Sequence, residues 1–348
     1  MKILTILLPG IGNTLLFTPT LRSLKKHFPN SEITALVMYK GSQEILEGNP
    51  YVDKIIFYPF MKRGHIKSLF FVLKQRFQNY DISILAYPAN RFQYSLIGFL
   101  IGAKTKITHL YDHNKLFSAS FFYSKKLPLD KNLHEVEENL NLLKLLNINA
   151  LEEDKSIFLK LDKEHENFTS DFIKTNKLKG KKLVGIHAGS SVLSGMINKR
   201  WPKERFISLI DKLSNKNTIC LLFGGNDEAD LKEWIYKNTK NKPILVNTPS
   251  VKHSASLIKK CNLFISNDTA LMHIAGALNT PTIILVGPVA RKTLPQGDIH
   301  TAIFKNLPCQ PCYRIGDTMK CVLNINYKCL KDITVDEVYN IAWKKLRV

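Results

Sequence analysis

Residues 262–288 (NLFISNDTALMHIAGALNTPTIILVGP) constrain the fold more than any other part of the chain. Residues 263–266 and 282–286 are short apolar runs, which are typical of buried parallel strands. Between them, residues 270–278 have the composition of a short helix that ends before a threonine–proline pair, since the residue before proline disfavours helical backbone. The pattern predicts a strand–helix–strand unit, and we expect Asp268 to cap the helix.

The turn before this helix is a candidate anion site. A strand followed at once by a helix directs backbone N–H groups and the positive end of the helix dipole out of the carboxyl edge of a parallel sheet. Phosphate is the commonest ligand of such an edge. From the residues of the turn alone, a phosphate site and an ordinary polar turn both remain open.

The alternation of strands and helices runs through the chain in two series. The first opens with a strand at residues 3–8, a glycine-bearing turn, a helix at 14–27 and a strand at 32–37. The second opens with a strand at 183–187, and the charged stretch 150–182 between the series lacks strong periodicity. Further elements are predicted at 42–47, 54–57, 60–77, 81–85, 92–101, 106–109 and 134–146, and at 203–213, 218–223, 228–238, 244–247, 254–260 and 334–346.

We therefore predict an α/β protein with two doubly wound, Rossmann-like domains that face each other across a cleft. Residues 1–170 form the N-terminal, acceptor-binding domain and residues 180–330 form the C-terminal, donor-binding domain. The final helix, in residues 331–348, is expected to pack back on the N-terminal domain. Substrates of such sheets bind at the carboxyl ends of the strands, so we expect the turn at 10–13 to face the turn at 266–269.

The formal net charge of +21 implies a polyanionic partner. The excess is spread over both halves of the chain, whereas a nucleic-acid-binding protein concentrates it in a stripe, so nucleic acid is not expected. No apolar run is long enough to span a membrane, and the N-terminal residues lack the features of a signal peptide. We expect a cytoplasmic protein with peripheral contact to the anionic inner membrane.

Several segments that follow strands of the second series suit a phosphorylated ligand. The loop 187–200 is rich in glycine and serine, with Ser190 and Ser191, and ends in the pair Lys199 and Arg200, either of which can neutralise phosphate oxygens. In 223–228 (FGGNDE), two glycines allow close backbone approach and Glu228 can accept from ribose hydroxyls. A solvated loop and a first-turn helix acid are the alternatives that remain open at these two segments.

Other nucleotide sites are excluded by what the chain lacks. The first turn has Gly10 and Gly12 but not the full dinucleotide fingerprint, so NAD is not expected. The chain has no Asp-x-Asp, which would signal a metal-bridged nucleotide, no P-loop and no Gly-x-Ser-x-Gly elbow. The phosphate charge would therefore be met by lysine, backbone amides and helix dipoles, and no cofactor is expected for catalysis.

These segments together resemble glycosyltransferase family 9, the lipopolysaccharide heptosyltransferases with the GT-B fold. Residues 266–288 are similar to the donor-binding signature of that family, although Ala270 stands where the family usually has glycine. The resemblance implies that Lys199, in KRWP, binds the donor phosphates and that Glu228 holds the donor ribose. It also implies donor contacts for three further residues of the turn and helix, Asp268, Thr269 and His273.

The N-terminal segment 8–29 (LPGIGNTLLFTPTLRSLKKHFP) resembles the acceptor-site signature, with Gly10, Gly12 and Asn13 as acceptor-binding residues. One departure matters here. Characterised relatives carry an aspartate, proposed as the general base, where this chain has Asn13, and an amide takes no proton near neutral pH. We expect Asn13 to orient the acceptor, and Asp112 and His113 are the candidates for a substitute base.

The resemblance implies an inverting, metal-independent glycosyltransferase that moves heptose from ADP-heptose to a lipopolysaccharide core or another cell-surface glycan. Two alternatives stay open. One is a protein-directed heptosyltransferase of the autotransporter-modifying type, and the other is a non-catalytic nucleotide-sugar binder, which Asn13 favours.

The cysteines form one cluster and two isolated residues. Four thiols that lie close together in the sequence of a protein from a reducing compartment are candidates for a tetrahedral structural zinc or iron site. They are Cys309, Cys312, Cys321 and Cys329. This cluster favours the protein-directed alternative, because it resembles the iron finger of those enzymes. Cys220 and Cys261 lie in apolar surroundings and are expected to be inert core residues.

Overall fold

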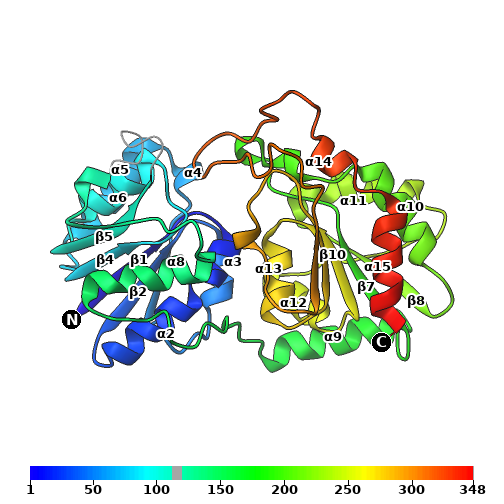
Figure 1. Ribbon diagram of the computed structural model, residues 1–348. Coiled ribbons are helices and arrows are strands. Elements are labelled where there is room, and N and C mark those ends of the chain that lie inside the picture. Colours follow the sequence, from blue (N-terminus) through cyan, green and yellow to red (C-terminus); the bar gives the residue numbers. More distant parts are fainter. Residues whose placement is uncertain (112–119, 348) are drawn as a thin grey trace. The chain divides into compact units, whose positions relative to one another are not determined.

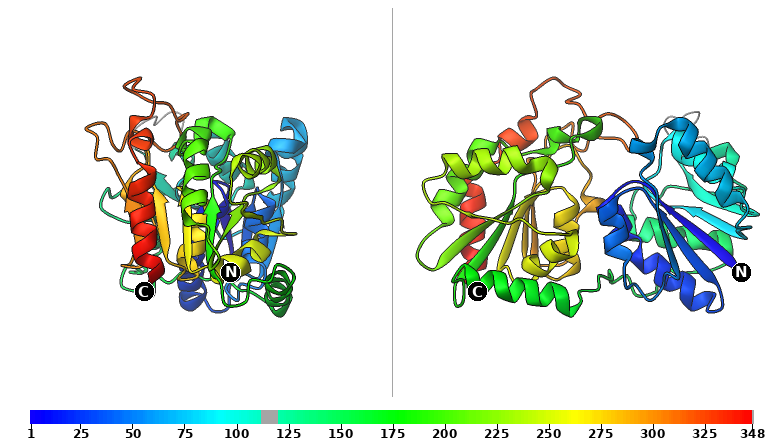
Figure 2. Two further views of the ribbon diagram at one scale, coloured as in Figure 1. Left: turned by 90° about the vertical axis from the view of Figure 1, so that its right-hand side faces the viewer. Right: turned by 180° about the vertical axis from the view of Figure 1, so that it is seen from behind.

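The computed structural model describes residues 1–111 and 120–347, which form two compact units, Met1–Lys160 and Leu161–Val348. Each unit has a parallel β-sheet with helices on both faces (Figures 1 and 2). The doubly wound α/β architecture predicted for both halves is therefore confirmed. The boundary between the units falls inside the stretch where a linker was expected.

The described residues of the first unit form a six-stranded sheet in the order β3-β2-β1-β4-β5-β6, with every neighbouring pair parallel. The strands are β1 (Lys2–Leu7), β2 (Glu32–Val37), β3 (Lys54–Phe57), β4 (Ile82–Leu85), β5 (Thr105–Leu110) and β6 (Lys125–Pro128). The helices are α1 (Ile11–Leu16), α2 (Thr18–His27), α3 (Lys40–Leu46), α4 (Phe60–Arg63), α5 (His65–Arg76), α6 (Phe92–Ile101) and α8 (Glu135–Asn141), with 3₁₀ turns η1 (Ser120–Phe122) and η2 (Leu142–Leu146).

The strand period of two divides the core of this unit between the two faces of the sheet. Ile3 and Leu7 of β1 join a buried cluster with α2 and α8, and Leu4 and Ile6 join the cluster on the opposite face with α5 and α6. Because both faces are covered, the strands read as continuous apolar runs, which is the pattern that identified them in the sequence.

The described residues of the second unit repeat this architecture, with the parallel order β12-β11-β10-β7-β8-β9. The strands are β7 (Lys182–His187), β8 (Thr218–Phe223), β9 (Ile244–Leu245), β10 (Leu263–Asn267), β11 (Thr282–Leu285) and β12 (His300–Ile303). The helices are α9 (Lys163–Thr175), α10 (Lys203–Leu213), α11 (Ala229–Asn238), α12 (Val251–Lys259), α13 (Ala270–Ala277), α14 (Lys328–Lys331) and α15 (Val335–Arg347), with 3₁₀ turns η3 (Leu193–Lys199), η4 (Asn226–Glu228) and η5 (Arg291–Thr293).

The strand order reverses at β1/β4 in the first unit and at β7/β10 in the second. On either side of such a switch point the connections leave toward opposite faces of the sheet, so a crevice opens at the carboxyl ends of these two strands. The acceptor candidates Gly10, Gly12 and Asn13 follow β1, and the donor candidates follow β7 and β10, except Glu228, which follows the neighbouring strand β8.

The predicted helix 14–27 is broken in the structure into α1 and α2, which meet at Phe17. Pro19 has no N–H to donate to the carbonyl of Leu15, and the Thr18 hydroxyl donates to that carbonyl instead, at 2.8 Å. Pro19 therefore causes the break between α1 and α2.

Helix α9, in the stretch expected to be a linker, packs on α12.

The C-terminal helix was predicted to pack on the N-terminal domain, and this was wrong. Helix α15 packs on α10 of its own unit (Figure 1). Val338, Ala342 and Leu346 recur at four-residue spacing and are buried in the same core cluster as Phe206 and Trp201. Amphipathic periodicity established that the helix buries one face, but it carries no information on which surface receives that face.

No helix in the described part of the chain is long and apolar enough to cross a membrane.

Candidate functional site

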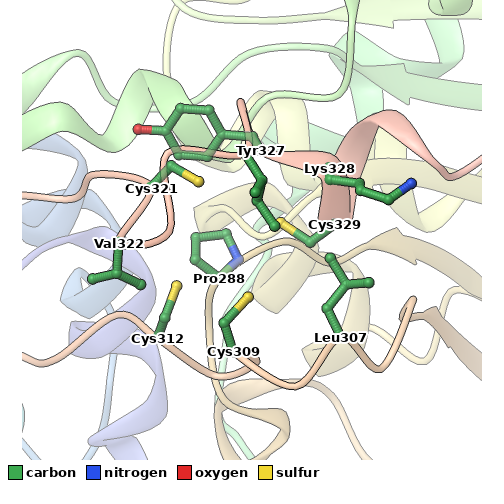
Figure 3. A pocket seen from close by; sticks show the side chains of 10 residues that line it. Pro288, Leu307, Cys309, Cys312, Cys321, Val322, Tyr327, Lys328 and Cys329 are labelled. Carbon is green, nitrogen blue, oxygen red and sulfur yellow. The ribbon is translucent and has the colours of Figure 1, made fainter.

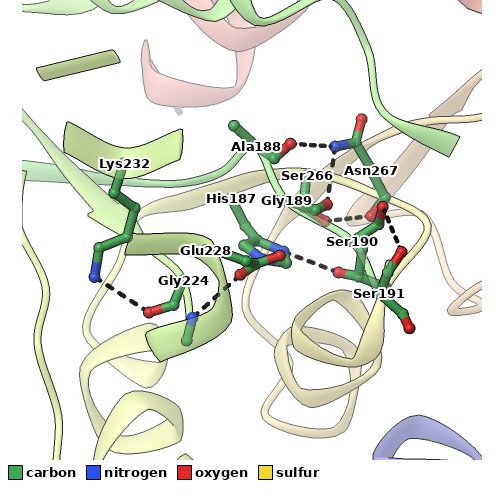
Figure 4. A network of polar contacts seen from close by, with 12 residues as sticks. His187, Ala188, Gly189, Ser190, Ser191, Gly224, Glu228, Lys232, Ser266 and Asn267 are labelled. Carbon is green, nitrogen blue, oxygen red and sulfur yellow. Dashed lines mark hydrogen bonds and ion pairs between the residues drawn. The ribbon is translucent and has the colours of Figure 1, made fainter. Parts of the chain in front are cut away.

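The site of the second unit lies at the carboxyl edge of its sheet, at the switch point. His187 ends β7, Asn267 ends β10, and Glu228 follows β8 (Figure 4). All three side chains are at least nine-tenths buried. Buried polar groups require partners, and here they are partners of one another or of the surrounding backbone.

His187 bridges two of the predicted donor residues. Its Nδ1 is 3.0 Å from the Thr269 hydroxyl and its Nε2 is 2.9 Å from Glu228 Oε2. The predictions from sequence did not include His187. The available signal was its position as the last residue of a central parallel strand, where side chains reach the ligand crevice.

Glu228 is held as a carboxylate. Burial acts to raise its pKa, but the His187 side chain, the Gly225 N–H at 3.1 Å and Arg200 outweigh burial and lower the pKa. The carboxylate also requires Gly189, because a Cβ on that residue would come within 1.7 Å of Glu228 Oε1. The close approach of Glu228 therefore explains why a glycine, Gly189, follows the end of β7.

Lys199 and Asp268 form an ion pair with 2.5 Å between Nζ and Oδ2. Burial acts to raise the pKa of Asp268, but Lys199 and His273 outweigh it, so the pKa lies below its usual value. Asp268 was expected to cap the following helix, and this was wrong. Thr269 is the N-cap residue of α13, and no side chain caps the helix.

Arg200 and Ser190 order the loop after β7. Arg200 donates through Nε to the Ser190 hydroxyl at 3.1 Å and through Nη2 to the Ser190 carbonyl, and Nη2 lies 4.0 Å from Glu228 Oε1. The Ser190 hydroxyl donates to the Met196 carbonyl at 2.9 Å, so Ser190 holds the loop together. Ser191 is exposed, and its hydroxyl accepts from the Leu193 N–H at 3.2 Å.

Two buried residues that sequence reasoning missed join the loops into one frame. Asn267 donates to the carbonyls of Ala188 and Gly189, at 3.0 and 3.1 Å, and accepts from the Trp201 N–H at 2.9 Å. Lys232 donates to the carbonyls of Gly224 and Val246 and to Asn247 Oδ1, at 3.2, 2.8 and 2.8 Å. A single lysine on a helix gives no sequence signal of such a role.

The remaining predicted donor residues lie at the start of α13. Ala270 is its first residue, and His273 is buried one turn later, where it contributes with Lys199 to the lowered pKa of Asp268. The structure therefore brings Lys199, Asp268, Thr269 and His273 to one helix N-terminus. Cations and a helix dipole at such a place favour an anionic ligand.

The acceptor residues predicted in the first unit lie after β1. Gly10 precedes α1, and Gly12 and Asn13 are in it. The Asn13 amide donates to Glu135 Oε1 at the start of α8, and Glu135 is only 2% exposed. Asp112 and His113, the predicted substitute bases, lie outside the described residues. Glu135 was missed because it is 122 positions from Asn13 in sequence.

The four clustered cysteines line one pocket, together with Pro288, Leu307 and Tyr327 (Figure 3). Burial and the neighbouring thiols raise the pKa of Cys329 to about 11 and also raise that of Cys312. No group of three or more His, Cys, Asp or Glu side chains in the described part of the chain is arranged around a metal position.

Cys220 and Cys261 are buried in the core, as predicted, and burial raises the pKa of each to about 12.

Comparison with known proteins identifies the family to which the chain is related. The family model described as "Glycosyltransferase family 9 (heptosyltransferase)" matches residues 71–323. Lipooligosaccharide heptosyltransferase 2 of Campylobacter jejuni subsp. jejuni serotype O:2 is 27% identical, and the alignment covers 100% of this chain and 99% of that protein.

Two solved structures are similar over almost the whole length. A glycosyl transferase family 9 protein from Veillonella parvula has a TM-score of 0.78 at 23% identity, covering 99% of this chain and 97% of that one. The E. coli ADP-heptose lps heptosyltransferase II has a TM-score of 0.74 at 20% identity, covering 100% and 99%. These likenesses show the GT-B fold, as the sequence resemblance implied.

Replacing Asp268 by Asn tests the ion pair. Because the pKa of Asp268 is lowered in the folded state, its contribution to stability is present above the unfolded pKa of about 4 and is lost as the pH falls through the folded pKa. We expect Asp268→Asn to reduce the free energy of unfolding at pH 7 by about 2–3 kcal/mol, near the lower end for a buried pair because Lys199 is partly exposed. Urea unfolding at pH 7 and below pH 4 measures this.

The difference between the wild type and Asp268→Asn should shrink on acidification. The exposed Asp298→Asn of the same unit is the matched control and should stay close to the wild type at both pH values. An equal difference at both pH values would contradict an ionised Asp268 in the folded protein.

Proposed function

The chain belongs to glycosyltransferase family 9, and we propose that it transfers a heptose from ADP-heptose to a hydroxyl of the lipopolysaccharide core or a related cell-surface glycan. The observation that carries the donor half is the grouping of Lys199, Asp268 and Thr269 at the N-terminus of α13 beside Glu228. Relatives named lipooligosaccharide heptosyltransferase and ADP-heptose lps heptosyltransferase support the choice of sugar, donor and acceptor.

Different residues of the second unit bind the diphosphate and the ribose of ADP-heptose. The diphosphate is placed at the N-terminus of α13, where Lys199 and the helix dipole oppose its charge. Glu228, kept ionised, accepts from the ribose hydroxyls. Because these groups supply the positive charge that a leaving diphosphate needs, the transfer proceeds without a catalytic metal ion.

The chemical step is a single displacement with inversion. The acceptor oxygen forms a bond to the anomeric carbon as the bond from that carbon to the diphosphate oxygen breaks, and ADP leaves with the electron pair. The acceptor hydroxyl loses its proton in the same step, so a general base is required. Asn13 cannot serve, because an amide is not basic near neutral pH.

We assign the base to Glu135, the carboxylate that contacts Asn13. The Asn13 NH₂ donates one N–H to Glu135, and its second N–H can donate to the acceptor oxygen and orient it, which leaves the hydroxyl proton to point to the Glu135 carboxylate. The proton passes to the Glu135 carboxylate as the hydroxyl attacks. A carboxylate one hydrogen bond behind position 13 thereby replaces the aspartate that relatives carry at that position.

The acceptor and its setting complete the assignment. A lipopolysaccharide core is assembled on a lipid anchor, so the enzyme works in the cytoplasm in peripheral contact with the inner membrane, and its basic surface suits a phosphorylated acceptor. The four-cysteine pocket favours a protein acceptor as the second candidate.

The cysteine pocket is proposed as a structural metal site. The four cysteines line one pocket and supply the donor type that tetrahedral zinc or iron prefers, and their side chains would have to draw together to hold the ion. The ion would hold the segment of residues 309–329 on the loop at Pro288 and has no part in the transfer. Binding requires the four thiols to lose their protons, and a bound cation supplies the charge that makes this favourable.

Donor binding is tested by thermal shift with nucleotide sugars. ADP-heptose at about 100 times its Kd should stabilise the protein by about 2.7 kcal/mol. Lys199→Ala should weaken binding roughly 10- to 100-fold, because it removes a charge-assisted contact to phosphate. The exposed Lys216→Ala is the control and should bind as the wild type does. Absence of a shift with every ADP-sugar would rule out the donor.

The base is tested by Glu135→Gln. Glutamine can still accept from Asn13, so we expect the fold and the KM for the donor to be kept while kcat falls about 10²- to 10⁴-fold. The exposed Glu152→Gln of the same unit is the control. Circular dichroism and steady-state transfer to a core acceptor measure both variants.

A second variant, Asn13→Asp, distinguishes a base from a structural carboxylate. Two adjacent carboxylates cannot both ionise freely, so one pKa rises, and the acid limb of the pH–rate profile should move to higher pH. Full activity of Glu135→Gln would remove Glu135 from the mechanism. Donor binding without transfer to any acceptor would favour the non-catalytic alternative.

The metal site is tested by elemental analysis of protein purified without chelator. We expect about one zinc or iron per chain from the four-thiolate donor set. Cys309→Ser/Cys312→Ser should lose the metal, whereas Cys220→Ala should keep it. A metal-free protein whose four clustered thiols all react with iodoacetamide in the native state would contradict the site.

A further inference from the structure

The outer face of α5 carries an apolar stripe that is exposed to solvent. Ile66, Phe70 and Phe77, the residue that follows the helix, are 74, 70 and 80% exposed, and Leu69 and Leu73 complete the stripe. Val72 is the buried residue of the helix. Globular proteins rarely leave so many large apolar side chains together in water unless the patch has a function.

Helix geometry shows that the stripe is not a frayed part of the core. At about 100° per residue, the five side chains cover a face about 100° wide. The opposite side of the helix turns to the protein, where Val72 is buried, Phe71 stacks on Tyr58 at 3.9 Å between ring centroids, and α5 packs on α6 (Figure 1). The helix is therefore apolar toward the protein and also toward the solvent.

Basic side chains border the stripe on both sides. By the same helical spacing, Lys67 and Lys74 lie along one edge and His65 and Arg76 along the other, and all four are exposed. Lys62 and Arg63, on the short helix α4, extend this border. An apolar face flanked by cations is the arrangement of helices that lie in a membrane interface.

The surrounding sequence has almost no negative charge to oppose these cations. Between Lys54 and Tyr111, Asp81 is the single acidic residue. Its carboxylate pairs with Lys104 at 2.8 Å. The basic residues of the same stretch are Lys54, Lys62, Arg63, Lys67, Lys74, Arg76, Arg91, Lys104 and Lys106.

Building on the peripheral membrane contact proposed above, we propose that α4 and α5 dock the first unit onto an anionic lipid bilayer, with the α5 stripe among the acyl chains and its basic borders on the headgroups. A nucleic acid would leave the five apolar side chains in contact with phosphates. A second copy of the chain would bring the basic borders of both copies together, and like charges oppose such pairing. A bilayer of anionic lipid satisfies both the apolar and the charged part of the surface.

Vesicle flotation with the full chain tests the docking. The protein should bind vesicles containing phosphatidylglycerol more than tenfold better than pure phosphatidylcholine, and salt should weaken the difference. Phe70→Ser/Phe77→Ser should reduce binding about tenfold or more. Ile299→Ser/Leu323→Ser, which changes two exposed apolar residues of the second unit, is the matched control and should bind as the wild type does.

The charged border is tested separately. Lys67→Gln/Lys74→Gln should weaken binding to the anionic vesicles roughly fivefold per lysine, whereas Lys216→Gln/Lys240→Gln, exposed lysines of the second unit, should have little effect. Wild-type binding by both α5 variants would overturn the proposal. So would conversion of a dimer to a monomer by the phenylalanine variant at unchanged vesicle binding, because the stripe would then be a contact between copies.

Discussion

The structure of the candidate site depends on the need of buried polar groups for hydrogen-bond partners at the carboxyl edge of a parallel sheet. Asn267 shows this constraint most directly. Its fully buried amide bonds two carbonyls of the loop after β7 and the backbone N–H of Trp201. One side chain at the end of β10 thus fixes both ends of the loop that carries Ser190, Lys199 and Arg200. Removing the amide would leave three buried backbone groups without these bonds.

The same constraint explains how the site can hold cations ready for an anion. Lys199 and Arg200 would repel each other if they were held without counter-charges, and each has a carboxylate close by, Asp268 and Glu228. His187 completes the network by joining Glu228 to Thr269. Because the carboxylates are held by these contacts, the positive groups are in place before a donor arrives, and such preorganised charge costs no reorganisation during the reaction.

Much of the fold could be predicted from sequence because buried parallel strands are continuous apolar runs. Strands β2, β3 and β8 and helices α6 and α10 have the predicted bounds. The strands that escaped prediction, β6 (KKLP) and β12 (HTAI), are edge strands whose polar residues leave no apolar run, whereas the edge strand β3 (KIIF) keeps one. Helix α15 shows the same limit in packing, since its periodicity reveals a buried face but not the surface that covers it.

The residues of the candidate site also fall into two groups, those that could be predicted from sequence and those that could not. Lys199, Glu228 and the 268–273 segment could be found because they follow strands within local motifs. His187 and Lys232 act through partners 8 to 82 positions away, and Glu135 contacts Asn13 across 122 positions. No local pattern carries such pairings, so only the fold reveals them.

In the proposed reaction, the second unit binds the water-soluble donor and the first unit binds the membrane-anchored acceptor. A nucleotide sugar is soluble, and every donor residue belongs to the second unit. A core glycan on a lipid anchor stays at the membrane, and the first unit holds both Asn13 with Glu135 and the α5 stripe. Docking through α5 would raise the local concentration of a lipid-anchored acceptor around Asn13 without any new contact to it. Loss of the stripe should therefore raise the KM for a membrane-embedded acceptor and leave that for a water-soluble acceptor fragment unchanged, since only the first depends on attachment to the bilayer.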